Sequence, residues 1–161
     1  ACDHPLQVIF HDRTQGGLWL EADDNLINSL LANLLSNSAR AGADRVELTC
    51  TADRRLLYRD NGSGADATAL ALLTQGKAEE PFLARGGTGL LLVREYAAAL
   101  EWKCCPAQQP EKGFAVDFVL PAHCPDPSQL VLADDAKQME CRHAACRRCM
   151  QQEFAATLWR E

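Results

Sequence analysis

The sequence lacks the long apolar runs and the basic runs that mark several classes of protein. None of its apolar stretches approaches the roughly 20 residues that a helix needs to cross a bilayer. Lysine and arginine total 16 against 22 acidic residues, which gives a net charge of −6. Because non-specific nucleic-acid binding depends on basic side chains that neutralise phosphates, this balance argues against a nucleic-acid partner. The first residues also carry no pattern typical of a secretory signal.

What the sequence does contain suffices for a compact domain. The chain has 161 residues, of which 47% are hydrophobic, and this is enough for one domain with its own core plus an appendage. Eight cysteines would suggest a disulfide framework in a small secreted protein. Here the core is adequate without such links, so we expect a cytoplasmic protein with reduced thiols.

Hydrophobic periodicity predicts alternating strands and helices in residues 1–121. Strands are expected at 5–10, 17–22, 44–51, 55–59, 101–105 and 114–121, and helices at 25–41, 65–74 and 88–100. Asp23 or Asp24 suits the N-cap of the first helix, and Gly42 suits its C-terminal end. Consecutive hairpins between helices predict an α/β (α+β) two-layer sandwich, with a mixed, mostly antiparallel sheet and about three helices on one face.

Residues 122–161 differ from this domain and are expected to form a linker and a C-terminal helix. Cys141, Cys146 and Cys149 have the spacing C-x₄-C-x₂-C, and with Cys124 or His143 they would suit a zinc or iron–sulfur site. The alternative is a helix in which cysteines serve as small apolar residues. On a continuous helix Cys141 and Cys146 point about 140° apart, which is poor geometry for shared ligation.

A polar stripe runs along the first predicted helix. Asn33, Asn37 and Arg40 fall within about 60° of one another on a helical wheel, beside the Leu/Ile face. Asparagine is a mediocre helix former, so its presence twice in mid-helix calls for an explanation other than propensity. Amide oxygens suit a divalent cation, and a guanidinium suits a phosphate. The alternative is a solvated helix edge.

Two glycine-containing segments follow. In "DNGSG", Asp60 ends a predicted strand, and Gly62 and Gly64 would let the backbone approach a flat ligand closely. In "RGGTGLLLVREY", a glycine cluster leads directly into a helix, and a helix N-terminus attracts anions. Each segment alone is equally typical of a turn or a helix cap.

The order and spacing of these three segments resemble the N box and the two glycine boxes of the GHKL ATPase superfamily. The sequence is most similar to the catalytic ATP-binding domain of bacterial sensor histidine kinases. "NLLSNSARAGADRVEL" resembles the N box, "DNGSG" the first glycine box, and "GGTGLLLVREYAAAL" the second. The resemblance covers about residues 5–121. It implies a histidine-kinase-like ATP-binding catalytic domain in residues 1–121, with ATP and Mg²⁺ as cofactors.

The resemblance also implies a role for each matching residue. Asn37 would hold Mg²⁺ on the phosphates, Asn33 would line the phosphate pocket, and Arg40 would contact phosphate. Asp60 would accept a hydrogen bond from the adenine amine, with Gly62 and Gly64 making room. The phosphates would also be contacted by residues of the second box and of the preceding loop: Lys77, Arg85, Gly86, Gly87, Thr88 and Gly89.

The implied reaction is transfer of the γ-phosphate to a histidine on a separate dimerisation module, with a response regulator as the next partner. His11 does not fit that acceptor, because only 22 residues separate it from Asn33, too few for a helical hairpin. The implied location is cytoplasmic, including the cytoplasmic part of a membrane-anchored sensor that forms a homodimer. Hydrolysing relatives place a Glu where this helix has Asn33, so the resemblance favours transfer over hydrolysis.

Two positions depart from the family pattern. Leu91 stands where a further glycine is usual, and Phe114 stands where a threonine is often found near adenine. Two alternatives therefore stay open: an anti-sigma-type serine kinase of the same superfamily, and a degenerate, non-catalytic interaction module.

Overall fold

The computed structural model describes residues 5–15, 18, 20, 22–75 and 88–122. In this part of the chain five strands form one sheet in the order β1-β2-β3-β5-β4. Their bounds are β1 Gln7–Arg13, β2 Arg45–Thr51, β3 Arg55–Asp60, β4 Lys103–Pro106 and β5 Ala115–Val119. Only β1 and β2 pair in parallel, and the other pairs are antiparallel. The predicted mixed, mostly antiparallel sheet is confirmed.

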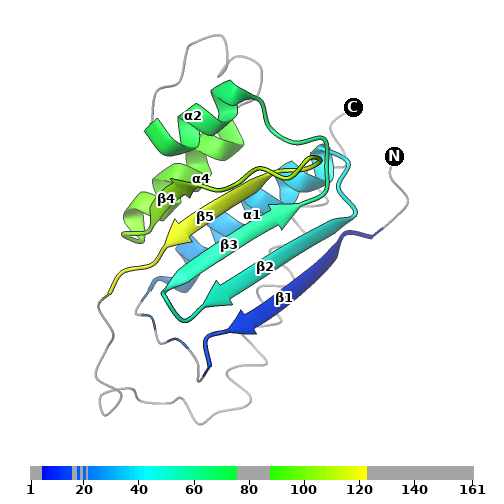
Figure 1. Ribbon diagram of the computed structural model, residues 1–161. Coiled ribbons are helices and arrows are strands. Elements are labelled where there is room, and N and C mark those ends of the chain that lie inside the picture. Colours follow the sequence, from blue (N-terminus) through cyan, green and yellow to red (C-terminus); the bar gives the residue numbers. More distant parts are fainter. Residues whose placement is uncertain (1–4, 16–17, 19, 21, 76–87, 123–161) are drawn as a thin grey trace. The chain divides into compact units, whose positions relative to one another are not determined.

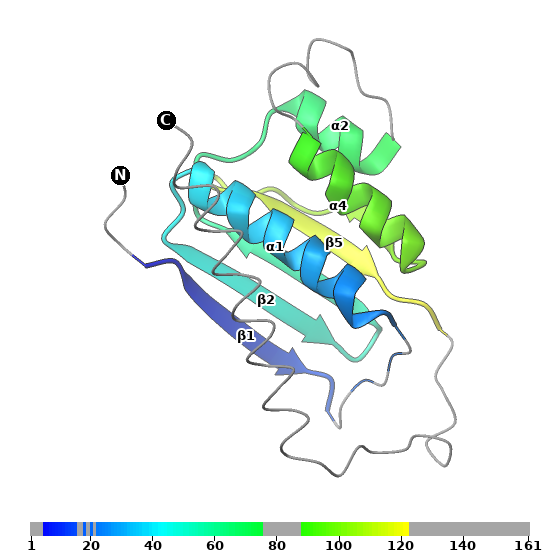
Figure 2. The same ribbon diagram turned by 180° about the vertical axis from the view of Figure 1, so that it is seen from behind.

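Three described helices cover one face of the sheet, as expected: α1 Asp24–Arg40, α2 Ala67–Gln75 and α4 Thr88–Ala99. Figure 1 shows the sheet in front of α1, and Figure 2 shows α1 and α4 side by side from behind. The helix α1 connects β1 to β2, which explains why these two strands run in parallel. The two-layer α/β class that the sequence predicted is confirmed.

Both ends of α1 have the signals that the sequence predicted. The Asp23 carboxylate accepts hydrogen bonds from the amides of Asn25, at 2.7 Å, and Leu26, at 3.4 Å. At the other end Gly42 has φ +71°, and the amides of Gly42 and Ala43 donate to carbonyls of the last turn. This is a Schellman motif, which satisfies carbonyls that a helix end leaves without partners.

The core lies between the sheet and the helices. It is formed by side chains that alternate along the strands and recur every three or four residues on the helices, among them Leu30, Leu34, Val46, Tyr58, Leu72, Val93, Ala97 and Phe118. The Trp102 and Phe118 rings lie 5.9 Å apart at 58°. The helix layer and the sheet thus share one apolar core.

One expected strand is wrong. Leu18, Leu20 and Ala22, the described residues of the stretch predicted as a strand at 17–22, are in no strand. Asp23 caps α1 immediately afterwards, so the chain must leave the level of the sheet for the helix layer at this point. The first strand also runs to Arg13 rather than ending at residue 10. Within the described residues, no helix has the length and apolar character that a membrane span requires.

Candidate functional site

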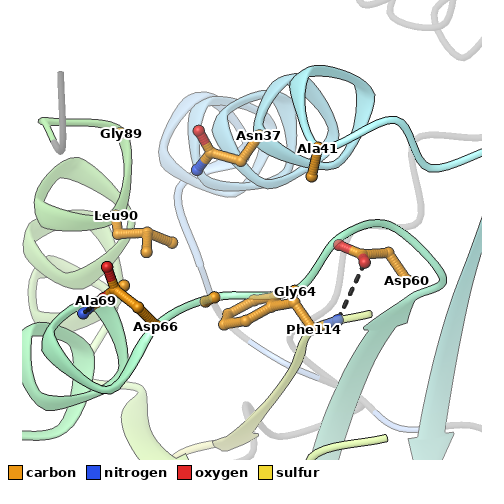
Figure 3. Close-up of a pocket in the computed structure, with 10 residues that line it drawn as sticks. Asn37, Ala41, Asp60, Gly64, Asp66, Ala69, Gly89, Leu90 and Phe114 are labelled. Atoms are coloured by element: carbon orange, nitrogen blue, oxygen red, sulfur yellow. Dashed lines mark hydrogen bonds between the residues drawn. The ribbon is translucent and has the colours of Figure 1, made fainter. Parts of the chain in front are cut away.

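A pocket of about 270 Å³ lies between the helix layer and the end of the sheet (Figure 3). Its walls come from the C-terminal half of α1, the segment after β3, the first turns of α2 and α4, and the residue before β5. The lining residues are Asn37, Ala41, Asp60, Gly64, Ala65, Asp66, Ala69, Gly89, Leu90 and Phe114. All three segments singled out in the sequence therefore contribute to one cavity.

Asp60 occupies one end of this pocket and is almost fully bonded. Asp60 is buried, with only 5% of its surface exposed. Oδ1 accepts from the amides of Gly62, at 2.9 Å, and Phe114, at 3.0 Å, and Oδ2 accepts from the Ser38 hydroxyl. A buried carboxylate is costly unless donors meet it, and here three donors do so.

Backbone geometry at this end depends on two glycines. Gly64 has φ +86°, and a Cβ there would lie 2.8 Å from the Gly113 carbonyl oxygen. Gly113 has φ +109°, and its Cβ would lie 1.9 Å from the Asp60 carbonyl oxygen. Neither position accepts a side chain without displacing the backbone beside Asp60. Gly113 was not identified from the sequence.

Asn37 and Arg40 lie at the other end of the site. The Arg40 guanidinium donates to Asn37 Oδ1 at 2.6 Å, and Arg40 is exposed. Asn37 Nδ2 is buried and has no hydrogen-bond partner among the described residues. The amide of Asn37 therefore has bonding capacity left over inside the pocket.

The helix α4 begins next to this amide. A Cβ on Gly89 would lie 2.7 Å from Asn37 Oδ1, so any other residue there would push the Asn37 amide out of its present position. The first amides of a helix have no partners within it, and they carry the positive end of its dipole. This end of the pocket thus combines an amide and a helix N-terminus, with the exposed Arg40 guanidinium bonded to that amide, and this set suits an anion.

Three predicted site residues do not line the pocket: Asn33, Gly62 and Arg40, of which Arg40 is joined to the site through its hydrogen bond to Asn37. Asn33 does not line the pocket, and its side-chain amide donates to the Ser29 carbonyl of its own helix at 2.8 Å. Gly62 does not line it either. A Cβ on Gly62 would lie 3.0 Å from the Ala41 carbonyl oxygen, so this glycine makes room for the end of α1 rather than for a ligand.

Other predictions lie wholly or partly outside the described residues. Lys77, Arg85, Gly86 and Gly87 belong to residues 76–87. The region predicted to begin at residue 122, with its C-terminal helix and the proposed Cys141, Cys146 and Cys149 site, lies outside the described residues except for residue 122 itself. Of Thr88 only the backbone is described, as the first residue of α4. These assignments stay predictions.

The two departures from the family pattern have different positions. Phe114 lines the pocket, is 7% exposed, and pairs with Asp60 through its backbone, donating to the carboxylate and accepting from the Asp60 amide. Leu91 is not among the lining residues, whereas its neighbour Leu90 is. Phe114 therefore forms part of the wall beside Asp60, and Leu91 does not line the pocket.

Sequence analysis missed two hydroxyl groups behind Asp60. Ser38 is 1% exposed and Tyr58 fully buried, and their oxygens lie 2.7 Å apart. A signal was present, because Ser38 follows Leu30 and Leu34 by eight and four residues on the buried side of α1. A polar residue on an apolar face needs a partner. Asp66, a further lining residue, caps α2 by accepting from the Ala69 amide at 2.8 Å.

Two similar solved structures are the ATP-binding domain of PrrB from Mycobacterium tuberculosis and the mycobacterial sensor histidine kinase MprB. The first is 17% identical, with a TM-score of 0.47 over 79% of this chain and 83% of that one. The second is 21% identical, with a TM-score of 0.46 over 71% and 81%.

A search of curated proteins gave no significant match. The model of one protein family, described as histidine kinase-, DNA gyrase B- and HSP90-like ATPase, matches residues 22–123. That range begins just before α1, ends after β5 and contains the whole pocket. The chain therefore belongs to the family of histidine kinase-, DNA gyrase B- and HSP90-like ATPases.

Proposed function

We propose that the chain is the ATP-binding catalytic domain of a two-component sensor histidine kinase. The observation that carries this proposal is one pocket with a buried carboxylate, Asp60, at one end and the Asn37 amide beside a helix N-terminus at the other. A nucleotide has the matching polarity, with a hydrogen-bond-donating base at one end and an anionic chain at the other.

Adenine would lie at the Asp60 end. The carboxylate accepts a hydrogen bond from the exocyclic amine, while Phe114, Leu90 and Ala69 supply apolar contact for the flat base. Gly64 keeps this wall free of a side chain. The phosphates would then extend toward Asn37 and the first turn of α4.

The donor set at the phosphate end fits Mg²⁺. Magnesium prefers oxygen ligands and is commonly held by one or two protein groups plus phosphate oxygens. The Asn37 amide oxygen is such a ligand, and the exposed Arg40 that now bonds it is free to turn to a phosphate. When bound, the ion neutralises phosphate charge. Gly89 and the backbone of Thr88 add amides of α4, and Lys77, Gly86 and Gly87 are the further proposed contacts.

Transfer to another protein, rather than hydrolysis, follows from the groups available. Of the described lining residues only Asp60 and Asp66 are carboxylates, and Asp60 faces the base while Asp66 caps α2. Neither replaces the glutamate that hydrolysing relatives carry at the position of Asn33. The P–O bond to ADP breaks as a bond to an imidazole nitrogen forms, and the domain contributes positioning and charge neutralisation.

The proposed partners follow from this reaction. The acceptor histidine lies on a dimerisation module, separate from residues 5–122, and a response regulator receives the phosphoryl group next. The expected location is the cytoplasm, where ATP is available.

Calorimetric titration of the full chain with a non-hydrolysable ATP analogue and Mg²⁺ tests the binding part of this proposal. We expect affinity in the micromolar range, lost in Asp60→Ala and Asn37→Ala. Arg59→Ala is the matched control, because Arg59 precedes Asp60 but is exposed and lies outside the pocket. Absence of binding at millimolar nucleotide would leave a non-catalytic interaction module as the better interpretation.

Phosphotransfer needs a second assay, with a histidine-bearing dimerisation module and labelled ATP. We expect a phosphorylated product that is labile in acid and stable in alkali, as a phosphohistidine is. An acid-stable product on a serine would favour the anti-sigma-type kinase instead.

A further inference from the structure

A chain of buried hydroxyl groups supports the Asp60 carboxylate from behind. Tyr58 Oη lies 2.7 Å from Ser38 Oγ, and Ser38 Oγ donates to Asp60 Oδ2. All three residues are buried, with exposed fractions of 0% for Tyr58, 1% for Ser38 and 5% for Asp60. The three side chains come from two elements, since Tyr58 and Asp60 share one face of β3 and Ser38 lies on α1.

The direction of each proton in this chain follows from its chemistry. An ionised carboxylate only accepts, so the single Ser38 proton points to Asp60. Ser38 Oγ then accepts from the Tyr58 hydroxyl. Burial raises the pKa of Tyr58, and the nearby Asp60 charge adds to this effect while the Ser38 hydrogen bond opposes it. Tyr58 therefore keeps its proton and remains a donor at neutral pH.

Counting acceptor positions shows what the hydroxyl chain leaves for a ligand. A carboxylate offers about four lone-pair positions. Oδ1 accepts from two amides and Oδ2 from Ser38, which leaves one position, on Oδ2, on a residue that lines the pocket. One remaining acceptor with a fixed orientation suits a single donor on the ligand.

We propose that Ser38 and Tyr58 are positioning residues that make the pocket select a purine with an exocyclic amine over one with a carbonyl group at the same place. The proposal rests on the proposed function, because it assigns the base of the bound nucleotide to the Asp60 end. An amine donates to the remaining acceptor, whereas a carbonyl oxygen would face a carboxylate oxygen with no proton between them.

The selectivity depends on the hydroxyl chain because water would take the place of a missing hydroxyl group. Without the Ser38 hydroxyl, Asp60 Oδ2 has a second open acceptor position, and a water molecule bound there would donate to Asp60 and present its second proton to a carbonyl. Water bridges both kinds of base, so discrimination falls. Without the Tyr58 hydroxyl, Ser38 keeps its bond to Asp60 but loses the donor that fixes its orientation, so the effect is smaller.

The test compares the affinities of the full chain for ATP and for inosine triphosphate, which differ in this group. We expect the wild type to prefer ATP about a hundredfold, because a buried acceptor loses its partner in the wrong ligand. Ser38→Ala should lower that ratio about tenfold and Tyr58→Phe about threefold. Ser36→Ala is the matched control, a serine on the same helix outside the pocket, and should leave the ratio unchanged.

The outcomes separate this proposal from the proposed function. A merely structural role for Ser38 would weaken both nucleotides equally and leave the ratio at its wild-type value, which would overturn the proposal while ATP binding stands. Failure of the wild type to bind ATP would overturn both. Should Ser38→Ala fail to fold, Tyr58→Phe removes a single oxygen and decides the question, since an unchanged ratio there also contradicts the proposal.

Discussion

The two ends of the pocket are built differently. At the Asp60 end each carboxylate oxygen has a partner, the donors are buried, and the backbone at Gly64 and Gly113 accepts no side chain. At the Asn37 end an amide nitrogen has no partner among the described residues, and the neighbouring Arg40 is exposed. The Asp60 end is part of the folded core, whereas the Asn37 end has polar groups that are available to bind a ligand. Substitutions at the two ends should therefore differ in what they cost.

Replacement of Asp60 should have the largest effect, because it removes a function and a structural centre together. Asp60→Ala leaves two buried amides and the Ser38 hydroxyl without their acceptor, so we expect unfolding to become easier by about 4 kcal/mol. ATP binding should disappear. Urea denaturation and calorimetry measure the two effects. If the stability of Asp60→Ala is unchanged, the Asp60 end does not belong to the folded core and does not differ from the Asn37 end in this respect.

Gly113→Ala should rank second and act on stability through the backbone alone. Its Cβ would lie 1.9 Å from the Asp60 carbonyl oxygen, so the chain must shift, at a cost of about 3 kcal/mol. Gly42→Ala is the control, since Gly42 also has positive φ, +71°, but open space around it. It should cost only about 1 kcal/mol. Thermal unfolding measures the loss of stability in each variant. If the two losses are equal, the positive φ explains the whole effect and the close approach of the Cβ to the Asp60 carbonyl oxygen explains none of it.

Asn37→Ala should separate function from stability. We expect micromolar ATP binding in the presence of Mg²⁺ to be lost, which corresponds to a fall in affinity of about a hundredfold or more. Stability should change by less than about 0.5 kcal/mol, because among the described residues the only side-chain bond lost is to the exposed Arg40, and a buried amide nitrogen without an acceptor there is removed. Repeating the titration with EDTA should shrink the difference from wild type. A loss of stability comparable to that in Asp60→Ala would remove the contrast between the two ends.

The smallest effect should appear at an ion pair remote from the pocket. Asp117 on β5 bonds Arg55 on β3 at 2.8 Å, and burial raises the pKa of Asp117 above its ordinary value of 3.8, with Arg55 opposing this. The folded protein thus holds this proton more tightly than the unfolded chain does. The contribution of Asp117 to stability is most favourable below pH 3.8 and is lost as the pH rises through the raised value.

Asp117→Asn should cancel this pH dependence without affecting ATP binding. Relative to wild type, the variant should gain stability as the pH rises across that window, by less than about 1 kcal/mol. Chemical denaturation from pH 3 to pH 7 measures the gap. If the variant instead loses stability relative to wild type as the pH rises, the assigned direction is reversed and the Arg55 ion pair has the dominant role.

Local patterns predicted the parts of the fold that depend on neighbours in sequence. The caps at Asp23 and Gly42 and the strand ending at Asp60 were readable because capping and alternation are short-range. The resemblance of the boxes pointed to Asn37, Asp60, Gly64 and Gly89, which line one pocket. The site residues that were missed lie where the chain meets itself at long range.

Ser38 and Gly113 illustrate that limit. Ser38 acquires its partners from β3, 20 and 22 residues away, and Gly113 approaches the carbonyl of Asp60. No periodicity within α1 or within the segment before β5 specifies those contacts. Asn33 was predicted to line the phosphate pocket from its place on the polar stripe, yet it does not line the pocket and its amide bonds the Ser29 carbonyl.

The close approach at Gly113 has a consequence for experiments that score every substitution at every position. Such a library, selected for nucleotide-dependent activity, should tolerate almost nothing at residue 113, although that residue is not among those lining the pocket. By intolerance alone it would be grouped with the residues that bind the nucleotide. A parallel selection for folded protein would separate them, since Gly113 would fail both screens and Asn37 only one.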